Sequence, residues 1–308
     1  MARRRKGEPV HGWLAVDKPA GLSSAAAVAI ARRALGAEKA GHGGTLDPLA
    51  TGLLPIAFGE ATKTVAYVMN GLKTYRFTIR WGEERSTDDA EGKVTTQSAI
   101  RPSRAEIEAQ LPEFTGRILQ APPAYSAIKV DGRRAYELAR TEGALELAKR
   151  PVEILSFRLL ELPDPDHAVF EVASGKGAYM RSLARDLSRR LGTVGHVAAL
   201  RRVAIGPFRE EQAISLERLV ALGHSAAAFE ALHPIGTVLD DIPALALSGE
   251  EADRLRRGQA IALLKRSDLA RVQRLEDGAT VFATCAGRPV ALTRFQAGSL
   301  RPVRVLNL

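Results

Sequence analysis

The sequence predicts an α+β protein in which a large domain of strands and helices, residues 11–240, precedes a small β-rich domain, residues 244–308. Three observations support this fold class. Lys73–Trp81 alternates large apolar and polar side chains, as a strand with one buried face does. Gly177–Leu191 places apolar residues at the spacing of one helix face. After the polar stretch Asp240–Pro243, short apolar runs separated by glycine-containing turns indicate further strands.

The charge balance points to a polyanionic partner. The 308 residues include 44 Lys and Arg against 35 Asp and Glu, a net charge of +9. A basic surface attracts nucleic acids, although many basic enzymes bind none. Residues 1–10 are expected to form a basic arm that either touches phosphate or is simply a solvated terminus. No apolar run approaches the roughly 18 residues of a membrane span, so we expect no membrane association.

Cysteine and histidine usage argues against a metal centre. Cys285 is the one cysteine, so neither an internal disulfide nor a cysteine-based zinc site is expected. The six histidines show no metal-ligand spacing. We therefore expect no metal or cofactor, and a reducing, cytoplasmic location.

The N-terminal segment reads as a strand, a turn and a helix. Gly12–Lys18 is a short apolar run that a proline-glycine turn ends. Ser23 or Ser24 caps a helix that Gly36 terminates. A second short helix is expected over Glu60–Met69.

The strand Lys73–Trp81 is followed by an acidic stretch. Phe77 and Ile79 are expected in the core, whereas Tyr75, next to a turn, lies either in the core or at the mouth of a cleft. We interpret the acidic stretch Glu83–Gly92 as a solvated turn, because its carboxylates lack metal-ligand spacing.

The middle of the chain contains a capped helix, two strands and a basic segment. Ser103 starts a capping box that opens a helix. Pro151–Leu162 and Ala168–Ser174 read as strands. Arg133–Arg140 combines basic and aromatic residues in a predicted short helix, which suits either a grip on a phosphate backbone or a solvated surface.

Arg181 is unusual within the helix predicted over Gly177–Leu191. A cation in the first turn opposes the helix dipole by a few tenths to about 1 kcal/mol. We therefore expect a carboxylate or phosphate partner for Arg181; the alternative is chance placement on an exposed turn. Beyond this helix, His196–Ile205 reads as a strand and residues 206–234 as largely helical.

The stretch Gly41–Pro55 has the features of a functional loop. Its four glycines permit sharp turns or close approach of another molecule. Pro48 keeps the preceding residue on extended or turn backbone. That residue, Asp47, is the only carboxylate of the stretch and has leucines around it, which makes it a catalytic candidate. The alternative is an aspartate that caps a turn through its own backbone.

Six motifs occur in order along the chain, and as a set they are far more specific than any one of them. They are Asp17-Lys18-Pro19-x-Gly21-x-Ser23-Ser24, Gly41-His42-x-Gly44-Thr45-Leu46-Asp47-Pro48-Leu49-Ala50-Thr51-Gly52, Lys73-x-Tyr75, Pro122-Pro123-x-Tyr125-Ser126-Ala127-x-Lys129, Gly177-x-Tyr179-x-Arg181-Ser182-Leu183 and Leu200-Arg201-Arg202. Up to about residue 210 the chain resembles the TruB family of tRNA pseudouridine synthases. The tail after Pro243 is more loosely similar to a PUA-type RNA-binding module. Gly43 stands where the family usually has a larger residue, which we expect to loosen the loop.

The resemblance implies a fold and an activity. The fold is a mixed, mostly antiparallel central sheet flanked by helices, with a small β-rich PUA-like domain at the C-terminus. The activity is the isomerisation of uridine 55 in the T-loop of tRNA to pseudouridine, on a base flipped out of the RNA. Residues 11–240 would form the catalytic domain and residues 244–308 an RNA-binding domain.

The resemblance also implies catalytic roles. Asp47 would act on C1′ or C6, or remove a proton from C2′, and Arg181 would pair with it and keep it charged. Tyr75 would stack on the target base, while Tyr179 would line the pocket and assist proton transfer at C5. His42 would fill the space that the flipped uridine leaves; otherwise it is a loop histidine bonded to backbone.

The remaining implied roles concern tRNA binding. Leu200 would form part of an apolar floor, and the basic segment together with the tail would hold the T-arm. The expected substrate-binding residues are His42, Leu200, Lys18, Lys129, Arg133, Arg134 and Arg202. We expect a monomer with no obligate protein partner.

Three alternatives stay open. A non-catalytic RNA-binding or tRNA-folding protein on the same fold would not need the carboxylate of Asp47. A guide-RNA-dependent pseudouridine synthase is the nearest rival within the class, although Leu49-Ala50 and Leu53-Leu54-Pro55 favour the stand-alone type. A nucleoside hydrolase would release free base and usually needs a cluster of aspartates, which the sequence lacks.

Overall fold

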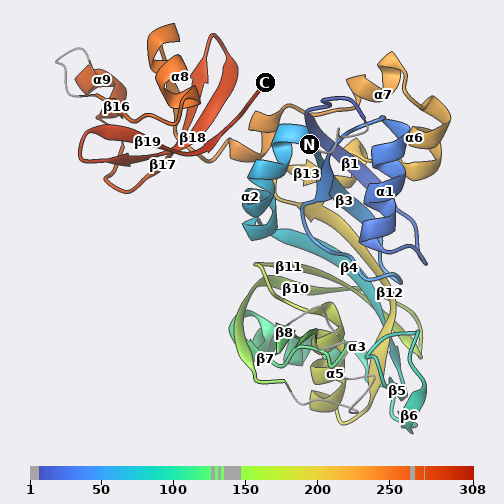
Figure 1. Ribbon diagram of the computed structural model, residues 1–308. Helices are drawn as coiled ribbons and strands as arrows, with labels where there is room; N and C mark the ends of the chain where they lie inside the picture. The colour runs from blue at the N-terminus through green and yellow to red at the C-terminus, as the bar shows by residue number, and fades with distance from the viewer. Residues whose placement is uncertain (1–6, 126–128, 131–132, 135–146, 264–267, 274) are drawn as a thin grey trace.

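The structure is a computed structural model that describes residues 7–125, 129–130, 133–134, 147–263, 268–273 and 275–308. Its long strands β4, β11 and β12 cross the middle of the molecule and link two halves (Figure 1). Helices α1, α6 and α7 lie in one half beside β1 and β3, and α3 and α5 lie in the other beside β7 and β10. The C-terminal strands form a separate sheet next to the first half.

The central sheet is mixed and mostly antiparallel, as predicted. Within the described residues, all of its pairs are antiparallel except β1 with β14 and β3 with β12. In spatial order it contains β14 (Ile214–Ser215), β1 (Gly12–Lys18), β3 (Thr51–Phe58), β12 (Gly195–Ile205), β4 (Lys73–Trp81), β11 (His167–Ser174), β10 (Arg150–Asp164) and β7 (Gly116–Gln120), with β2 (Ala40–His42) on β3 and β13 (Phe208–Arg209) on β12.

Helices and hairpins cover this sheet. The α-helices are α1 (Ser24–Ala34), α2 (Val65–Asn70), α3 (Arg104–Gln110), α5 (Met180–Arg190), α6 (Leu216–Leu222) and α7 (Ala226–Glu230), and the 3-10 segments are η1 (Gly59–Thr64), η2 (Leu111–Phe114), η3 (Glu210–Gln212) and η4 (Ile235–Leu239). The hairpins are β5 (Glu83–Arg85) with β6 (Val94–Gln97), and β8 (Lys129–Val130) with β9 (Arg133–Arg134). Ser23 caps α1 and Ser103 opens α3 through a capping box, as their sequences predict.

Strand β4 forms the centre of the core. Its alternating residues Tyr75, Phe77, Ile79 and Trp81 are all buried, which confirms the predicted strand. The ring of Phe77 stacks on Phe170 of β11, with centroids 5.6 Å apart. Helix α5 packs its apolar stripe over β4 and β12, and its first turn lies near the start of β4 and the middle of β12.

Several local predictions need correction. The loop predicted over residues 41–55 is shorter, because β2 extends to His42 and β3 begins at Thr51. Arg133 and Arg134 lie in strand β9 rather than in the predicted helix, while residues 135–140 lie outside the described part of the chain. Residues 206–234 mix short strands, a 3-10 turn and two helices.

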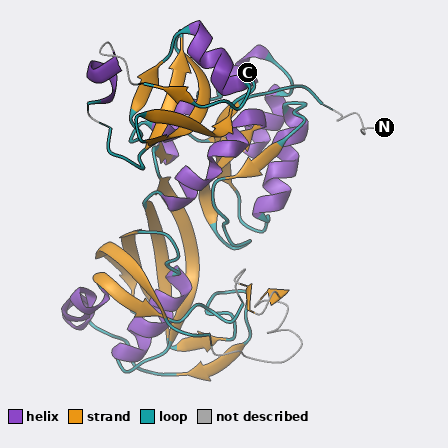
Figure 2. Ribbon diagram, turned by 60° about the vertical axis from the view of Figure 1, so that its left-hand side comes forward, coloured by secondary structure: helices purple, strands orange, loops and turns teal. Residues whose placement is uncertain are grey.

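The C-terminal sheet has its own core and packs against the first half of the molecule, side by side with it in both views (Figure 2). It consists of β15 (Ala244–Ala246), β17 (Thr280–Cys285), β18 (Arg288–Gln296), β19 (Ser299–Val305) and β16 (Ile261–Ala262), accompanied by α8 (Gly249–Arg256) and α9 (Leu269–Val272). Phe282 and Leu306 join the apolar cluster that contains Val238 of η4. The boundary at residues 240–244 stays a prediction. No helix of the described residues has the length and apolar character needed to cross a membrane.

Candidate active site

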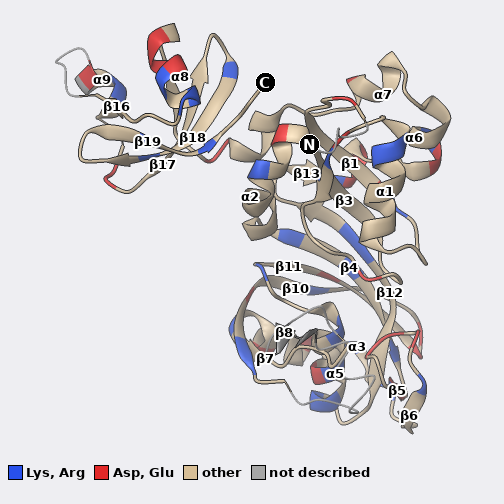
Figure 3. Ribbon diagram, in the orientation of Figure 1, with Lys and Arg blue, Asp and Glu red and all other residues tan. Residues whose placement is uncertain are grey.

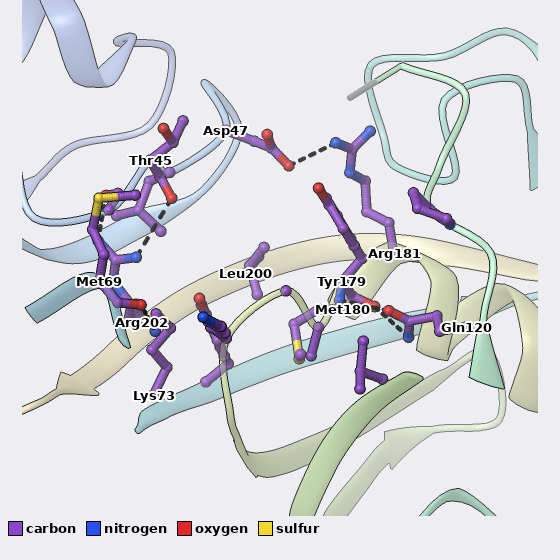
Figure 4. Close-up of a pocket in the computed structure, with 18 of the residues that line it drawn as sticks. Thr45, Asp47, Met69, Lys73, Gln120, Tyr179, Met180, Arg181, Leu200 and Arg202 are labelled. Atoms are coloured by element: carbon purple, nitrogen blue, oxygen red, sulfur yellow. Dashed lines mark hydrogen bonds and ion pairs between the residues drawn. The ribbon is translucent and has the colours of Figure 1, made fainter. Parts of the chain in front are cut away.

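A pocket of about 570 Å³ opens between the two halves of the molecule. One wall is the loop that links β2 to β3, and the opposite wall is the segment that leads into α5 (Figure 4). The first residues of β4 and β10, the end of α2 and the middle of β12 complete the lining. The pocket therefore collects side chains from five motifs that lie far apart in the sequence.

Two buried cations hold the loop that carries Asp47. The guanidinium of Arg202, whose residue is 1% exposed, donates to the carbonyls of Leu53 at 2.8 Å and Gly44 at 3.0 Å. Lys18 has no exposed surface, and its Nζ donates to three carbonyls, including that of Pro48 at 3.2 Å. Burial lowers the pKa of Lys18 to about 8. Donors of Lys18 and Arg202 therefore position the loop, and a contact of either side chain with RNA stays a prediction.

Gly43 packs closely instead of loosening the loop. A Cβ at this position would lie 2.8 Å from Cγ1 of Val68 and 3.3 Å from the ring of Trp13. The Gly43 amide also donates to the carbonyl of Pro55 at 2.8 Å. Only a residue without a side chain permits this approach of the loop to α2, because valine is stiff at χ1.

Asp47 and Arg181 face each other across the top of the pocket (Figure 4). Nη2 of Arg181 lies 2.9 Å from Oδ2 of Asp47, so the expected ion pair is present. The Asp47 side chain is 37% exposed, whereas that of Arg181 is 6% exposed. The guanidinium also donates to the carbonyls of Thr87 and Tyr125, each at 3.0 Å. These contacts explain a cation in the first turn of α5 and fix the direction in which it meets Asp47.

A second carboxylate faces the same arginine. Oδ2 of Asp89 lies 3.5 Å from Nη1 of Arg181, and the Asp89 side chain is 4% exposed. Its Oδ1 accepts from the hydroxyl of Thr87 and from the amide of Glu91. Arg181 is thus held between the exposed Asp47 and the buried Asp89.

The neighbouring Asp88 is also inside the protein. It forms an ion pair with Arg185 at 3.0 Å, and burial raises its pKa although Arg185 opposes the shift. The interpretation of residues 83–92 as a solvated turn is therefore wrong. Nothing in the local sequence distinguishes these two aspartates from surface carboxylates; only the unexplained charge of Arg181 hinted at a partner.

Aromatic and apolar side chains form the interior of the pocket. Tyr75 is 9% exposed and Leu200 is 8% exposed, and both line it as expected. The Tyr179 hydroxyl points toward Asp47 and Arg181 (Figure 4). Burial raises the pKa of Tyr179, and the charge of Asp47 raises it further, so the phenol is neutral at physiological pH.

Gln120 fixes the position of Tyr179, a role that the sequence analysis missed. Its Oε1 accepts from the Tyr179 amide at 2.8 Å, and its Nε2 donates to the Tyr179 carbonyl at 3.1 Å. Gln120 is 2% exposed, and Tyr179 begins α5 without a side-chain cap. The amide of Gln120 therefore replaces the missing cap and holds the backbone of the pocket tyrosine at two points.

The remaining predicted substrate-binding residues are His42, which does not line this pocket, and three basic residues whose side chains the structure does not describe. His42 ends β2, and its buried Nδ1 has no hydrogen-bond partner in the described part of the chain, which does not support the alternative of a backbone-bonded histidine through that atom. Burial lowers the pKa of His42. Lys129, Arg133 and Arg134 belong to the β8–β9 hairpin, but their side chains are not among those described.

Comparisons with known proteins agree with this geometry. The family model described as TruB family pseudouridylate synthase (N terminal domain) matches residues 32–180, and the tRNA pseudouridylate synthase B C-terminal domain matches residues 181–242. The tRNA pseudouridine synthase B of Rhodospirillum rubrum is 55% identical over 308 residues, covering 100% of both chains. That of Caulobacter vibrioides is 52% identical over 309 residues, again covering 100% of both.

A solved structure supports the fold. The crystal structure of a Cbf5-Nop10-Gar1 complex contains a chain that superposes with a TM-score of 0.73 at 23% identity, covering 100% of this chain and 91% of that one. At this identity the likeness shows a shared fold. The family models and the full-length relatives go further, and they show that the chain belongs to the TruB family of pseudouridylate synthases.

Proposed function

We propose that this chain is a stand-alone tRNA pseudouridine synthase that isomerises uridine 55 in the T-loop of tRNA. The observation that carries the proposal is the ion pair of Asp47 and Arg181 above a pocket lined by Tyr75, Tyr179 and Leu200. Relatives named tRNA pseudouridine synthase B, identical at 52–55% of positions over the whole chain, support the same activity. The chain in the Cbf5-Nop10-Gar1 complex supports only the fold.

The residues fit the chemistry of the reaction. The glycosidic C1′–N1 bond breaks, a C1′–C5 bond forms, the proton on C5 leaves and N1 regains a proton, so no oxidant or reductant is needed. Asp47 is exposed enough to reach a bound ribose or base, and Arg181 fixes its orientation. The carboxylate would serve as nucleophile at C1′ or C6, or as base at C2′.

The pocket supplies the environment for a single flipped base. A uracil ring can lie against Tyr75, with Leu200 beneath it. The neutral phenol of Tyr179 can donate a hydrogen bond near Asp47, and we propose that it assists the loss of the C5 proton. We further propose that His42 fills the space left in the RNA, that the C-terminal domain helps to hold the T-arm, and that a cytoplasmic monomer without a metal or cofactor carries out the reaction.

Tritium release tests this proposal directly. Wild-type protein and Asp47→Asn are incubated with tRNA transcripts that carry tritium at uridine C5, because C5 loses its hydrogen only when a new bond forms there. We expect release by the wild type and none by Asp47→Asn, with tRNA binding retained by both. A transcript with cytidine at position 55 is the matched control and should release no tritium from that site.

The outcomes separate the remaining alternatives. No release by the wild type, with binding intact, would favour a non-catalytic RNA-binding protein on this fold. Release by Asp47→Asn at the wild-type rate would remove the carboxylate from the mechanism. A sedimentation-velocity run at assay concentration checks the proposed monomer.

A further inference from the structure

Five basic side chains line the pocket, and the structure already uses three of them. Arg181 is paired with Asp47, and Arg202 donates to carbonyls of the loop. Lys73 is 8% exposed, and its Nζ donates to the carbonyls of Met69 at 2.8 Å and Gly71 at 2.7 Å, at the end of α2. These three cations are therefore already bound to backbone carbonyls or to a carboxylate of the protein.

The other two basic side chains are Arg150 and Lys176, and both are exposed at the rim. In the described part of the chain, neither is paired with a carboxylate. Lys176 has one polar contact, 3.3 Å from Nζ to Oδ1 of the neutral Asn70. Arg150 begins β10, and its backbone is fixed by pairing with Gln120 of β7. Within the described residues these two cations are consequently available to a ligand, and the backbone of Arg150 is held by the sheet.

The two cations belong to different sides of the pocket. Arg150 pairs with Gln120, whose side chain holds Tyr179 on the side of the ion pair. Lys176 contacts Asn70 at the end of α2, on the side where Lys73 begins β4. Basic residues also occur on β4 and β12 around the middle of the molecule (Figure 3). A ligand that touches both rim cations therefore spans the mouth of the pocket.

A nucleotide in an RNA chain has the matching arrangement of charge. Its base can enter a pocket, while the phosphates on its two sides remain at the mouth with the rest of the backbone. Asp47 repels these phosphates, so cations at the rim are needed to offset that repulsion. Arginine presents a planar fork that suits a phosphodiester, and lysine supplies a compact point charge.

We propose that Arg150 and Lys176 bind the two phosphates that flank the nucleotide whose base occupies the pocket. The inference rests on the proposed function and adds the part of the substrate that the rim recognises. It also assigns separate tasks to the basic residues of the site. The buried cations bind carbonyls or a carboxylate of the protein itself, and the exposed pair holds the RNA backbone.

The test is the salt dependence of RNA binding. A T-arm hairpin RNA is titrated with wild type, Arg150→Ala, Lys176→Ala and the double variant at several salt concentrations. Each lost phosphate contact should lower the slope of log Kd against log salt by about 0.7–0.9, and weaken binding roughly fivefold. Arg150→Lys and Lys176→Arg keep the charge and should keep most of the slope. Arg218→Ala, an exposed arginine on α6, is the matched control and should leave the slope unchanged.

Neutralised phosphates identify the contacts. Hairpins with a methylphosphonate linkage on the 5′ or the 3′ side of the target uridine should bind the wild type more weakly. On the alanine variant that lacks the contact to that phosphate, the modified and the unmodified hairpin should bind equally well.

Two results would overturn the inference. One is an unchanged salt slope in the double variant. The other is a methylphosphonate effect that persists undiminished in both alanine variants, which would place the bound phosphates elsewhere on the protein. Both are binding measurements, so they are distinct from failure of the proposed function, which is the absence of tritium release by wild-type protein.

Discussion

Replacing Gln120 tests how strongly stability and activity depend on its two hydrogen bonds to the backbone of Tyr179. In Gln120→Ala the Tyr179 amide loses its acceptor, whereas the Tyr179 carbonyl still accepts from the Leu183 amide at 3.1 Å. One unsatisfied buried N–H costs about 1–3 kcal/mol. The packing lost with a side chain that is 2% exposed adds roughly 1 kcal/mol. We expect the free energy of unfolding, measured in urea, to fall by about 2–4 kcal/mol.

The effect on activity follows from the placement of the phenol. Tyr179 sits at the start of α5 next to Arg181, so a released backbone lets the ring move relative to Asp47. A displacement on the order of 1 Å can lower a rate about 100-fold. We expect the single-turnover rate of tritium release at saturating tRNA to fall by about 10- to 100-fold while the Kd for tRNA stays near wild type.

A double-mutant cycle separates positioning from general damage. If Gln120 acts through the Tyr179 hydroxyl, Gln120→Ala should slow a Tyr179→Phe background much less than it slows wild type. Equal losses in both backgrounds would refute the reasoning, and would shift attention to the segment after β7. An unchanged rate in Gln120→Ala, with stability lowered as expected, would limit the side chain to a role in folding.

Three further predictions concern the same site. Asp89→Asn removes the negative charge 3.5 Å from Arg181, so we expect the free energy of unfolding to fall by about 1–3 kcal/mol and the single-turnover rate to fall with tRNA affinity retained. A wild-type rate would show that Asp47 and the carbonyls of Thr87 and Tyr125 orient the arginine without Asp89. Gly43→Thr places a Cβ 2.8 Å from Cγ1 of Val68 and should cost about 1–3 kcal/mol of unfolding free energy. Combining it with Val68→Ala should return part of that loss, and a purely additive pair would contradict the packing account. Because the pKa of Tyr179 is raised above 10.0, the phenol keeps its proton as pH rises toward that value, so the ratio of wild-type to Tyr179→Phe rates should stay constant between pH 7 and 9; a ratio that falls in this range would mean an ionising phenol.

Periodicity predicted the parts of the fold that depend on local burial. The alternation in Lys73–Trp81 and the stripe in α5 reflect faces that must be buried whatever their partners are, so both elements form as expected. Arg181 was conspicuous because its charge opposes the helix dipole, and that conflict predicted a carboxylate or phosphate partner, which the family resemblance identified as Asp47. A residue whose charge conflicts with its local structure, as that of Arg181 does, was therefore a useful indicator of the site.

The sequence could not show whether a charged side chain is buried or exposed when its partners lie far away in the chain. Lys18 and Arg202 look like RNA contacts in a basic protein, yet their donors meet carbonyls that the fold brings from other segments. Asp88 and Asp89 look like solvated loop residues for the same reason, since the helix that covers them lies about ninety residues away in the chain. Arg133 and Arg134 read as helix formers, but cross-strand pairing decides their conformation.

The loop of Asp47 rests on two buried positive charges whose donors, within the described residues, go to neutral carbonyls. The charge of Asp47 favours the protonated form of Lys18, and that of Arg202 opposes it. The carboxylate that we propose as catalytic therefore also acts as a counter-ion of the scaffold below it. In many enzymes, removing an active-site charge makes the fold more stable at the expense of turnover. At Asp47 we expect no such gain in stability, because its charge favours the charged form of a buried lysine that holds the loop.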